Sequence, residues 1–361
     1  MIGVVTTSYP RFPDDSAGVF VRERVRELLA LGHEVEILAA GDGDTSSDGA
    51  VTRVRAGGLF YAGGAPEALE GALLLPRLAA WGRALGFSCA LSGEITRRAQ
   101  RWHAVESHWL VPCGLLACAA LPRLPHRAHV HGGDLHLLAR LPWGDSMPRV
   151  LCRGRAELVF ASASLRDGFS ALAGASPESL GARSRVEAAP FDRSLFHVST
   201  DGERQCARAE LGLVGPTVLA AGRLVPIKGY DVLVAAVGRI PSSSRPALLI
   251  AGEGPENLRL GRAARAAGVH LRLLGPLGQR ALAEWMAAAD LFVHPCRTLT
   301  SGRSEGMPLV VREALASGLP TIASASGGLV ELRGTDGLTL VKADDVAVLA
   351  AAIESALSLA R

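Results

Sequence analysis

Two glutamates, Glu305 and Glu313, have seven residues between them, and their types and spacing suggest a ligand-binding site. Pro308 suits the first turn of a helix, where no N–H is needed, and Gly318 suits the position after a helix. One glutamate would then lie in the loop before the helix and the other in its second turn. Free N–H groups at such a helix start attract phosphate, and here they would belong to Gly306, Met307 and Leu309. A carboxylate beside them can hold vicinal hydroxyls, so the segment predicts a sugar-nucleotide site. The alternative is a capped helix with surface glutamates.

Two basic residues lie in one loop after the strand expected over Thr217–Ala221. Gly222 allows the chain to leave that strand tightly, and Arg223 and Lys228 can then converge on one anion. An arginine contacts a diphosphate through two N–H groups, and a lysine adds a point charge. We therefore expect a diphosphate-binding loop here. An ordinary loop that carries two basic residues is the alternative.

A histidine-containing turn, His131–Asp134, follows a further expected strand end. At neutral pH a histidine can form a hydrogen bond with a sugar hydroxyl or a leaving phosphate. Two alternatives stay open: His131 is structural, or it binds a metal together with His129, Asp134 and His136. His129 and His131 share a strand face, but His136 follows a turn, so the metal site is the weaker alternative.

The loop after the first expected strand, Ile2–Thr6, contains Gly18 directly before a helical segment. A glycine there lets the backbone approach a ligand at the helix N-terminus, or the loop merely caps the helix. Acidic pairs that could be mistaken for a metal-binding Asp-x-Asp motif occur at Asp14 and Asp15 and at Asp42 and Asp44. The stretch that follows Asp42 is rich in Gly, Ser and Thr, so we expect a solvated turn there.

Strand-like and helix-like segments alternate along the whole chain, which predicts α/β domains with parallel, doubly wound sheets. Val19–Leu31, for example, has helical period and follows the apolar run Ile2–Thr6. The pattern restarts after a short strand expected over Val186–Ala189, so we expect an N-terminal domain of residues 1–195 and a C-terminal domain of residues 196–361. A length of 361 residues fits two domains, and ligands bind at the carboxyl ends of the strands in such sheets.

The second half repeats the alternation and ends in a helix. Its strands are expected over Thr217–Ala221, Leu248–Gly252, Leu271–Gly275, Leu291–His294 and Thr321–Ala323, with helices between them. Asp344–Leu359 is expected to form a last amphipathic helix, because its apolar residues recur with helical spacing.

Composition and charge exclude several classes of function. The formal charge of +3 is spread evenly over the chain, so no basic footprint for nucleic acid is present. None of the six cysteines forms a Cys-x-x-Cys pair, which argues against a disulfide framework or a zinc knuckle and fits a reducing cytoplasm. No apolar run reaches the ~18 residues that a membrane span needs. The longest, Gly71–Leu91, predicts a packed helix, although it could also lie on a membrane surface.

The segment Glu305–Glu313 resembles the Glu-x7-Glu motif of retaining glycosyltransferases of family 4. That family has the GT-B fold, in which two Rossmann-like domains face a cleft. The loop Gly222–Gly229 resembles the family signature Gly-Arg-Leu-x-x-x-Lys-Gly, and Gly252–Pro255 resembles its Gly-x-Gly-Pro turn near the nucleotide. His131–Asp134 resembles the His-Gly-x-Asp element that faces the donor sugar. The loop that ends in Gly18 departs from the family, because Ala17 stands where a glycine is frequent.

The resemblance implies transfer of a sugar from a nucleoside-diphosphate sugar to a glycan, a lipid-linked sugar or a small molecule. The N-terminal domain would serve the acceptor and the C-terminal domain the donor, with no cofactor or metal in the chemistry. The residues implied in catalysis are Glu305, His131, Arg223 and Lys228. The residues implied in donor binding are Gly18, Glu253, Leu277, Gly306, Met307, Pro308, Leu309 and Glu313.

The resemblance also suggests individual roles. Glu313 would hold the ribose hydroxyls, Glu305 would lie beside the donor sugar, and the backbone near Leu277 would meet the base. Glu253 contacts the ligand or is simply a solvated turn residue. The enzyme would act in the cytoplasm, with contact to the inner face of the membrane left open. Two other functions keep the same site: a sugar-nucleotide epimerase of GT-B fold, and a sugar-nucleotide-binding protein without catalysis.

Overall fold

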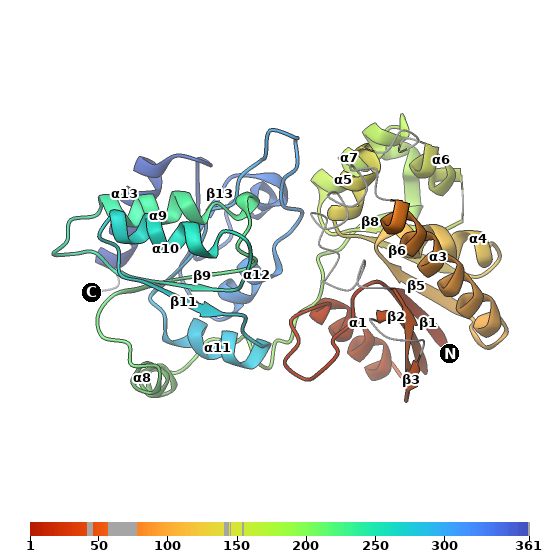
Figure 1. Cartoon of the computed structure of the whole chain (residues 1–361), viewed down its shortest axis with the longest axis horizontal. Helices are drawn as coiled ribbons and strands as arrows, with labels where there is room; N and C mark the ends of the chain where they lie inside the picture. Colours follow the sequence, from red (N-terminus) through yellow and green to blue (C-terminus); the bar gives the residue numbers. More distant parts are fainter. Residues whose placement is uncertain (42–45, 57–77, 141–143, 145, 154, 360–361) are drawn as a thin grey trace. The chain divides into compact units, whose positions relative to one another are not determined.

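The computed structural model describes residues 1–41, 46–56, 78–140, 144, 146–153 and 155–359. The chain forms two compact units, Met1–Pro190 and Phe191–Arg361, and each is built on its own sheet (Figure 1). The division falls at Pro190, a few residues before the boundary expected from the sequence. Both units are α/β with parallel strands, so the predicted fold class is confirmed.

An eight-stranded sheet forms the centre of the N-terminal unit. Its strands are β1 (Ile2–Thr6), β2 (Val35–Gly41), β3 (Ser46–Asp48), β4 (Val51–Arg55), β5 (Ala104–His108), β6 (His126–Val130), β7 (Glu157–Phe160) and β8 (Ser184–Val186). Their order is β3-β4-β2-β1-β5-β6-β7-β8, and only the β3–β4 pair among these described strands is antiparallel. Ile2 of β1 pairs with Val35 on one side and Ala104 on the other, so the order of connection reverses between β1 and β5.

Helices cover both faces of this sheet. They are α1 (Val19–Ala30), α3 (Leu78–Arg98), α4 (Leu115–Ala120), α5 (Gly133–Arg140), α6 (Ser146–Arg153) and α7 (Ala163–Ala173). Neighbouring residues of β1 show the two faces, because Val4 packs in the cluster of α1 and Val5 in the cluster of α3. A strand that is buried on both faces has to be apolar throughout, which explains the continuous run Ile2–Thr6.

The long helix α3 confirms a packed helix within the apolar stretch Gly71–Leu91, of which residues 71–77 lie outside the described structure. Phe87, Leu91 and Ile95 of α3 are buried in one cluster with strand residues. Among the described helices, none combines the length and the apolar character that crossing a membrane requires.

The C-terminal unit contains a six-stranded parallel sheet with the order β11-β10-β9-β12-β13-β14. Its strands are β9 (Thr217–Ala221), β10 (Ala247–Ala251), β11 (Leu271–Gly275), β12 (Leu291–His294), β13 (Thr321–Ser324) and β14 (Leu338–Val341). Its helices are α8 (Asp201–Glu210), α9 (Tyr230–Arg239), α10 (Asn257–Ala266), α11 (Gln279–Ala288), α12 (Leu309–Ala316) and α13 (Val346–Leu359). The order of connection reverses between β9 and β12.

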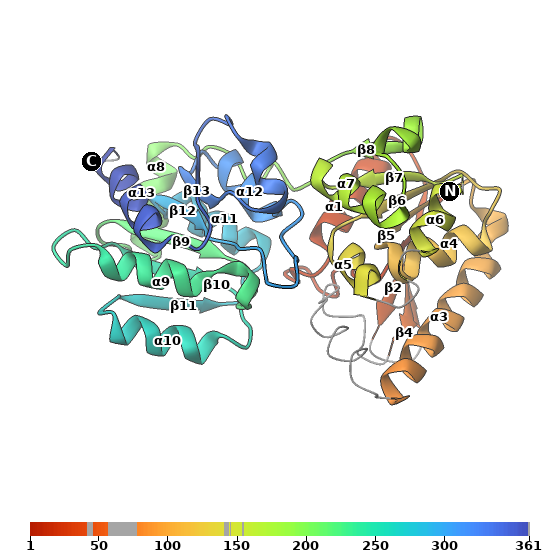
Figure 2. The same ribbon diagram turned by 90° about the horizontal axis from the view of Figure 1, so that it is seen from above.

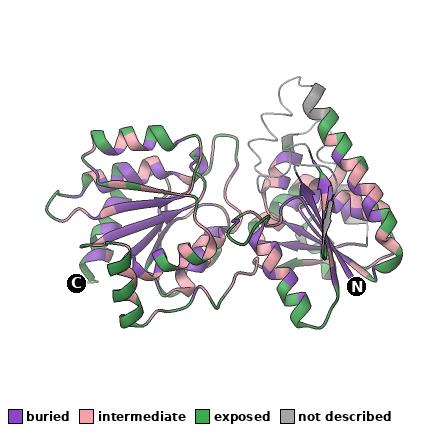
Figure 3. Cartoon of the chain, turned by 60° about the horizontal axis from the view of Figure 1, so that its bottom comes forward, coloured by how far each residue is buried: buried purple, intermediate pink, exposed green. Residues whose placement is uncertain are grey.

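Two helical layers enclose this second sheet. α9, α10 and α13 lie on one face, and α11 and α12 lie on the other, as seen from two directions in Figures 1 and 2. Figure 3 shows buried residues along the strands of both units and exposed residues on the outer helix surfaces. The loops at the carboxyl ends of the strands are therefore held by rigid, fully packed elements.

Most predicted strands are confirmed, and one is wrong. β9, β11 and β12 have the predicted bounds. The strand expected over Val186–Ala189 lies earlier, over Ser184–Val186. Glu187 still donates its N–H to the Phe160 carbonyl at 2.8 Å, but the strand stops there, shortly before Pro190, which has no N–H to give.

Candidate active site

An ion pair joins the two loops that flank the reversal point of the C-terminal sheet. Lys228 follows β9, and Glu305 follows β12. The Nζ atom of Lys228 donates a hydrogen bond to Oε2 of Glu305 at 3.0 Å, and both side chains are largely buried. Open α/β sheets bind ligands at this place, outside the carboxyl ends of the strands where the order reverses. The structure therefore brings together two of the residues that the sequence suggested for catalysis.

The loop that carries Lys228 requires a glycine at position 229. Gly229 has a φ of +67°, and a Cβ atom there would lie 2.0 Å from the carbonyl oxygen of Pro295. Arg297 also donates its N–H to the carbonyl of Ile227 at 2.9 Å. The loop after β9 thus lies directly against the segment after β12, which fixes the position of Lys228. Arg223, at the start of the same loop, is exposed.

A pair of glycines that the sequence reasoning missed, Gly327 and Gly328, contacts the backbone carbonyl of Glu305. Gly328 donates its N–H to the carbonyl of Glu305 at 3.1 Å. A Cβ atom on Gly327 would lie 2.0 Å from that same oxygen. These glycines follow the buried strand β13 after two intervening residues, and a Gly-Gly pair shortly after a strand end is the signal that could have identified them.

Charge around Glu305 keeps it ionised despite its burial. Burial raises the pKa of this carboxyl, but the charge and hydrogen bond of Lys228, together with the charge of Arg223, bring it below its usual value. His294, the last residue of β12, is fully buried, and burial together with Lys228 lowers its pKa to about 3. At neutral pH the group is therefore an anionic Glu305 and a cationic Lys228 beside a neutral imidazole.

Glu313 lies in the second turn of α12, as predicted, and it is buried. Pro308 occupies the position before the first helical residue, so its expected place inside the first turn was wrong. One carboxylate oxygen of Glu313, Oε1, has no hydrogen-bond partner. Burial raises the pKa of this carboxyl to about 7, although a hydrogen bond from Gln279 and the charge of Arg312 act in the opposite direction. A buried acceptor without a partner suits a ligand hydroxyl.

The residues between the two glutamates form the approach to α12. Gly306, Met307 and Leu309 are half-buried and Pro308 is buried, so this stretch lies at the edge of the packed core. Gly318 ends the helix in the left-handed conformation, with a φ of +70°, as expected. The helix therefore starts at Leu309, between the two glutamates as predicted, with Gly306, Met307 and Pro308 joining it to Glu305.

The neighbouring loops of the sheet are packed backbone against backbone. A Cβ atom on Gly252 would lie 2.0 Å from the carbonyl oxygen of Gly222, and one on Gly254 would lie 2.5 Å from that of Leu224. Glu253 is exposed, and its carbonyl accepts the N–H of Leu224 at 2.8 Å. Leu277 is half-buried against the core beside α11. These loops line up along the same sheet edge as Lys228.

In the N-terminal unit, the structure does not assemble the metal site considered for His129, His131, Asp134 and His136. The carboxylate of Asp134 accepts backbone N–H groups from Leu110 at 2.7 Å and from Gly132 and Leu135 at 3.0 Å. It therefore fixes the turn at the start of α5 and has a structural role.

A different group of possible ligands occurs in the described part of this unit: atoms of Glu106, His108 and His129 lie within 4.8 Å of one another. The rings of His108 and His129 are stacked, with an angle of 12° between their planes. Stacked rings direct their nitrogen lone pairs in parallel planes, whereas a tetrahedral zinc site needs them to converge. Arg24 also donates to both oxygens of Glu106. The group fits a stacked polar cluster better than a metal centre.

His131 lines a pocket with Phe20, Arg24, His108 and His129. Its ring lies 4.6 Å from that of Phe20 between centroids. Burial, and then the charge of His129, lowers the pKa of His131 to about 3, so the ring is neutral at physiological pH. This placement suits a hydrogen-bonding residue.

Gly18 takes the left-handed conformation directly before α1, with a φ of +70°. A Cβ atom there would lie 2.3 Å from the carbonyl oxygen of Ser8, so the close approach predicted for this glycine is to its own loop. Asp15 is buried and accepts N–H groups from Arg11 and Ala17, which explains it as a structural residue. Asp42 and Asp44 lie outside the described residues.

Comparisons with known proteins agree with this geometry. Residues 215–358 match the family model described as glycosyl transferases group 1. A D-inositol 3-phosphate glycosyltransferase of Jonesia denitrificans is 31% identical over 340 residues, which cover 86% of this chain and 75% of the relative. A GDP-mannose-dependent alpha-(1-6)-phosphatidylinositol monomannoside mannosyltransferase of Mycobacterium tuberculosis is 35% identical over 254 residues, 65% of this chain and 62% of the relative. This match therefore spans less than two thirds of that relative's length.

Solved structures show the same fold. Sucrose-phosphate synthase from Thermosynechococcus elongatus superposes with a TM-score of 0.74 at 20% identity, covering 100% of this chain and 90% of the other. WaaG, a glycosyltransferase involved in lipopolysaccharide biosynthesis, gives a TM-score of 0.69 at 16% identity, with 99% and 90% coverage. Together with the two Rossmann-like sheets and the Lys228–Glu305 site, these matches show that the chain belongs to the group 1, or family 4, glycosyltransferases of GT-B fold.

Proposed function

We propose that this chain transfers a sugar, with retention of anomeric configuration and without a metal, from a nucleoside-diphosphate sugar to a hydroxyl acceptor. One observation carries the proposal: the buried Lys228–Glu305 pair, 3.0 Å apart, lies at the reversal point of the C-terminal sheet. A cation and an anion at that point can each bind one part of a sugar nucleotide. The cation would bind the diphosphate, and the anion would form hydrogen bonds with the sugar.

We propose that each residue around this pair contacts a different part of the donor. Lys228 and Arg223 lie in one loop and would stabilise the negative charge that develops on the departing diphosphate. The carboxylate of Glu305 would orient the sugar or stabilise positive charge at its anomeric carbon. A ribose hydroxyl would donate a hydrogen bond to Oε1 of Glu313, which has no partner within the protein.

The acceptor and donor to test first are proposed from the names of the relatives. The names of the two relatives concern a phosphatidylinositol mannoside and inositol 3-phosphate, so a cyclitol or lipid-linked glycan is the acceptor class to test first. GDP-mannose is the corresponding first donor. A lipid-linked acceptor would place the reaction at the cytoplasmic face of the membrane, in the assembly of a glycolipid or polysaccharide.

Incubation with a panel of sugar nucleotides, with and without inositol phosphates and a lipid extract, tests the proposal. Acceptor-dependent release of nucleoside diphosphate supports transfer, and NMR of the product then shows whether the anomeric configuration is retained. Isomerisation of the donor without acceptor would support an epimerase of the same fold. Binding without any turnover would support a non-catalytic sugar-nucleotide-binding protein.

A further inference from the structure

His131 shares a hydrogen bond with a second histidine to which the proposed reaction assigns no role. Nδ1 of His108 lies 3.2 Å from Nε2 of His131. His108 is the last residue of β5, and its Cα atom pairs with that of His129 on β6. Neighbouring strands lie about 4.8 Å apart, so side chains on one face can stack. The rings of His108 and His129 do so, with centroids 4.4 Å apart, and the ring of His131 is parallel to that of His108 within 10°.

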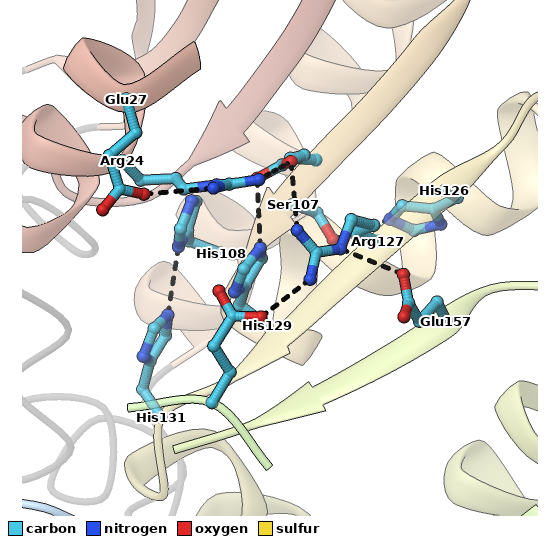
Figure 4. Close-up of polar contacts among 11 residues, drawn as sticks. Arg24, Glu27, Ser107, His108, His126, Arg127, His129, His131 and Glu157 are labelled. Carbon is cyan, nitrogen blue, oxygen red and sulfur yellow. Dashed lines mark hydrogen bonds and ion pairs between the residues drawn. The ribbon is translucent and has the colours of Figure 1, made fainter. Parts of the chain in front are cut away.

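A buried ion pair supports this stack. Arg24 of α1 donates from Nε and from a terminal nitrogen to the two oxygens of Glu106, at 2.9 and 2.7 Å. Nε2 of His129 lies 3.2 Å from the same carboxylate. An ionised carboxylate only accepts hydrogen bonds, so His129 donates this one. Figure 4 shows Arg24, His108 and His131 in succession, with His129 beside them. The ring of His108 is thus held against a residue that is itself fixed by charge.

The surroundings of His108 decide which nitrogen carries its proton. Burial lowers the pKa of His108 well below its usual value, and the neighbouring histidines, Arg24 and Arg127 lower it further, so the ring is neutral. Its Nε2 atom is buried and has no hydrogen-bond partner. Buried N–H groups without an acceptor are rarer in proteins than buried acceptors without a donor, so the unpartnered Nε2 atom is the bare one. His108 therefore carries its proton on Nδ1 and donates it to Nε2 of His131.

A neutral imidazole has one proton, and this fixes the state of His131. Because Nε2 of His131 accepts, its proton must lie on Nδ1. We propose that His108 is a positioning residue, which holds His131 as the Nδ1–H tautomer so that His131 donates a hydrogen bond to an oxygen of the sugar nucleotide. The consequence for transfer rests on the proposed function, whereas the tautomer does not.

The tautomer can be measured on the full chain without any substrate. Nitrogen-15 NMR of histidine-labelled protein distinguishes the two ring nitrogens, and the signals of His131 are assigned by their loss in His131→Ala. We expect a protonated Nδ1 and a bare Nε2. His108→Phe keeps an aromatic ring but has no donor, and it should shift His131 toward the other tautomer. His108→Asn places an amide N–H where Nδ1 was and should restore the original form. An Nε2–H tautomer in the unaltered chain would overturn the proposal.

A matched control and a kinetic readout complete the test. His126→Phe removes another buried imidazole of β6, which is bonded to Ser107 at 2.8 Å, and should leave the His131 ring signals unchanged. A shift in that variant would mean that general loosening of the sheet sets the tautomer, which overturns the assignment.

With GDP-mannose and acceptor, His108→Phe should lower kcat about tenfold, the scale of one lost hydrogen bond, with KM for the donor little changed. His108→Asn should recover most of that loss. An unchanged kcat in His108→Phe contradicts the positioning role, whereas no turnover by the unaltered chain with any donor contradicts only the proposed function.

Discussion

Replacing Glu313 by glutamine should stabilise the ligand-free protein at alkaline pH. Burial raises the pKa of Glu313 to about 7 from an ordinary value of 4.5. A carboxyl whose pKa is higher in the folded state favours folding only while it is protonated. Its contribution is complete below pH 4.5 and is lost as the pH rises through 7. Above that pH, the folded protein has to bury an ionised Glu313 carboxylate of which one oxygen has no hydrogen-bond partner.

The size of the effect follows from this shift. One pKa unit corresponds to about 1.4 kcal/mol, so the carboxylate should cost roughly 3 kcal/mol at pH 8 and less than about 1 kcal/mol at pH 5. Glu313→Gln keeps the shape and the hydrogen-bonding capacity of the side chain but cannot ionise. The substitution should therefore raise the free energy of unfolding at pH 8 by up to about 3 kcal/mol, with little gain at pH 5.

Denaturant unfolding of the wild type and of Glu313→Gln at both pH values measures this difference. The fluorescence of Trp285, which packs in the C-terminal unit, helps to follow that unit. Glu253→Gln, which removes an exposed carboxyl from the same unit, is the matched control for the loss of one charge. A stability gain of the same size at pH 5 and pH 8, or no gain at pH 8, would refute the argument from burial.

Three further predictions concern the reaction itself. Arg223→Ala and Lys228→Ala should each raise the barrier to transfer by about 2–4 kcal/mol, because each removes a charge that we propose stabilises the leaving diphosphate; wild-type kcat in both variants would exclude that role. Glu305→Gln should mainly lower kcat and Glu313→Gln should mainly raise KM, and calorimetry with nucleoside diphosphate should show weaker binding only for Glu313→Gln. The reversed pattern would exchange the two assignments. Activity should survive EDTA, and a complete loss that Mn²⁺ or Mg²⁺ restores would show that the chemistry needs a metal.

Local sequence patterns were sufficient to predict the elements and the main loops of the site. Lys228 and Glu305 each follow a recognisable strand, and parallel strands place their carboxyl ends on one edge. The partners that complete the site come from other elements. Gln279 of α11 forms a hydrogen bond with Glu313. Gly327, which follows β13, packs against the carbonyl of Glu305. Such contacts depend on how the elements pack, and no spacing along the chain encodes them.

The histidine stack illustrates the same limit in the N-terminal unit. His131 was identified from a turn motif, but His108 lies 23 residues earlier, at the end of another strand. The two meet only because β5 and β6 are neighbours in a register that places His108 opposite His129. Strand register in a sheet buried on both faces leaves no alternating pattern to read. The metal site kept as the weaker alternative among His129, His131, Asp134 and His136 is not assembled, because the Asp134 carboxylate accepts backbone N–H groups instead.

The backbone-to-backbone packing of Gly222, Gly252 and Gly254 also determines where this site can change. A side chain at Gly252 or Gly254 would collide with the backbone of the loop after β9, and one at Gly222 would meet the hydroxyl of Tyr230. All three glycines also have φ values that disfavour other residues. Arg223 and Glu253 adjoin these glycines and are exposed, so substitutions there leave the backbone packing in place. A library that randomises those two positions and keeps the glycines should retain folded proteins, whereas one that includes the glycines should consist largely of misfolded variants.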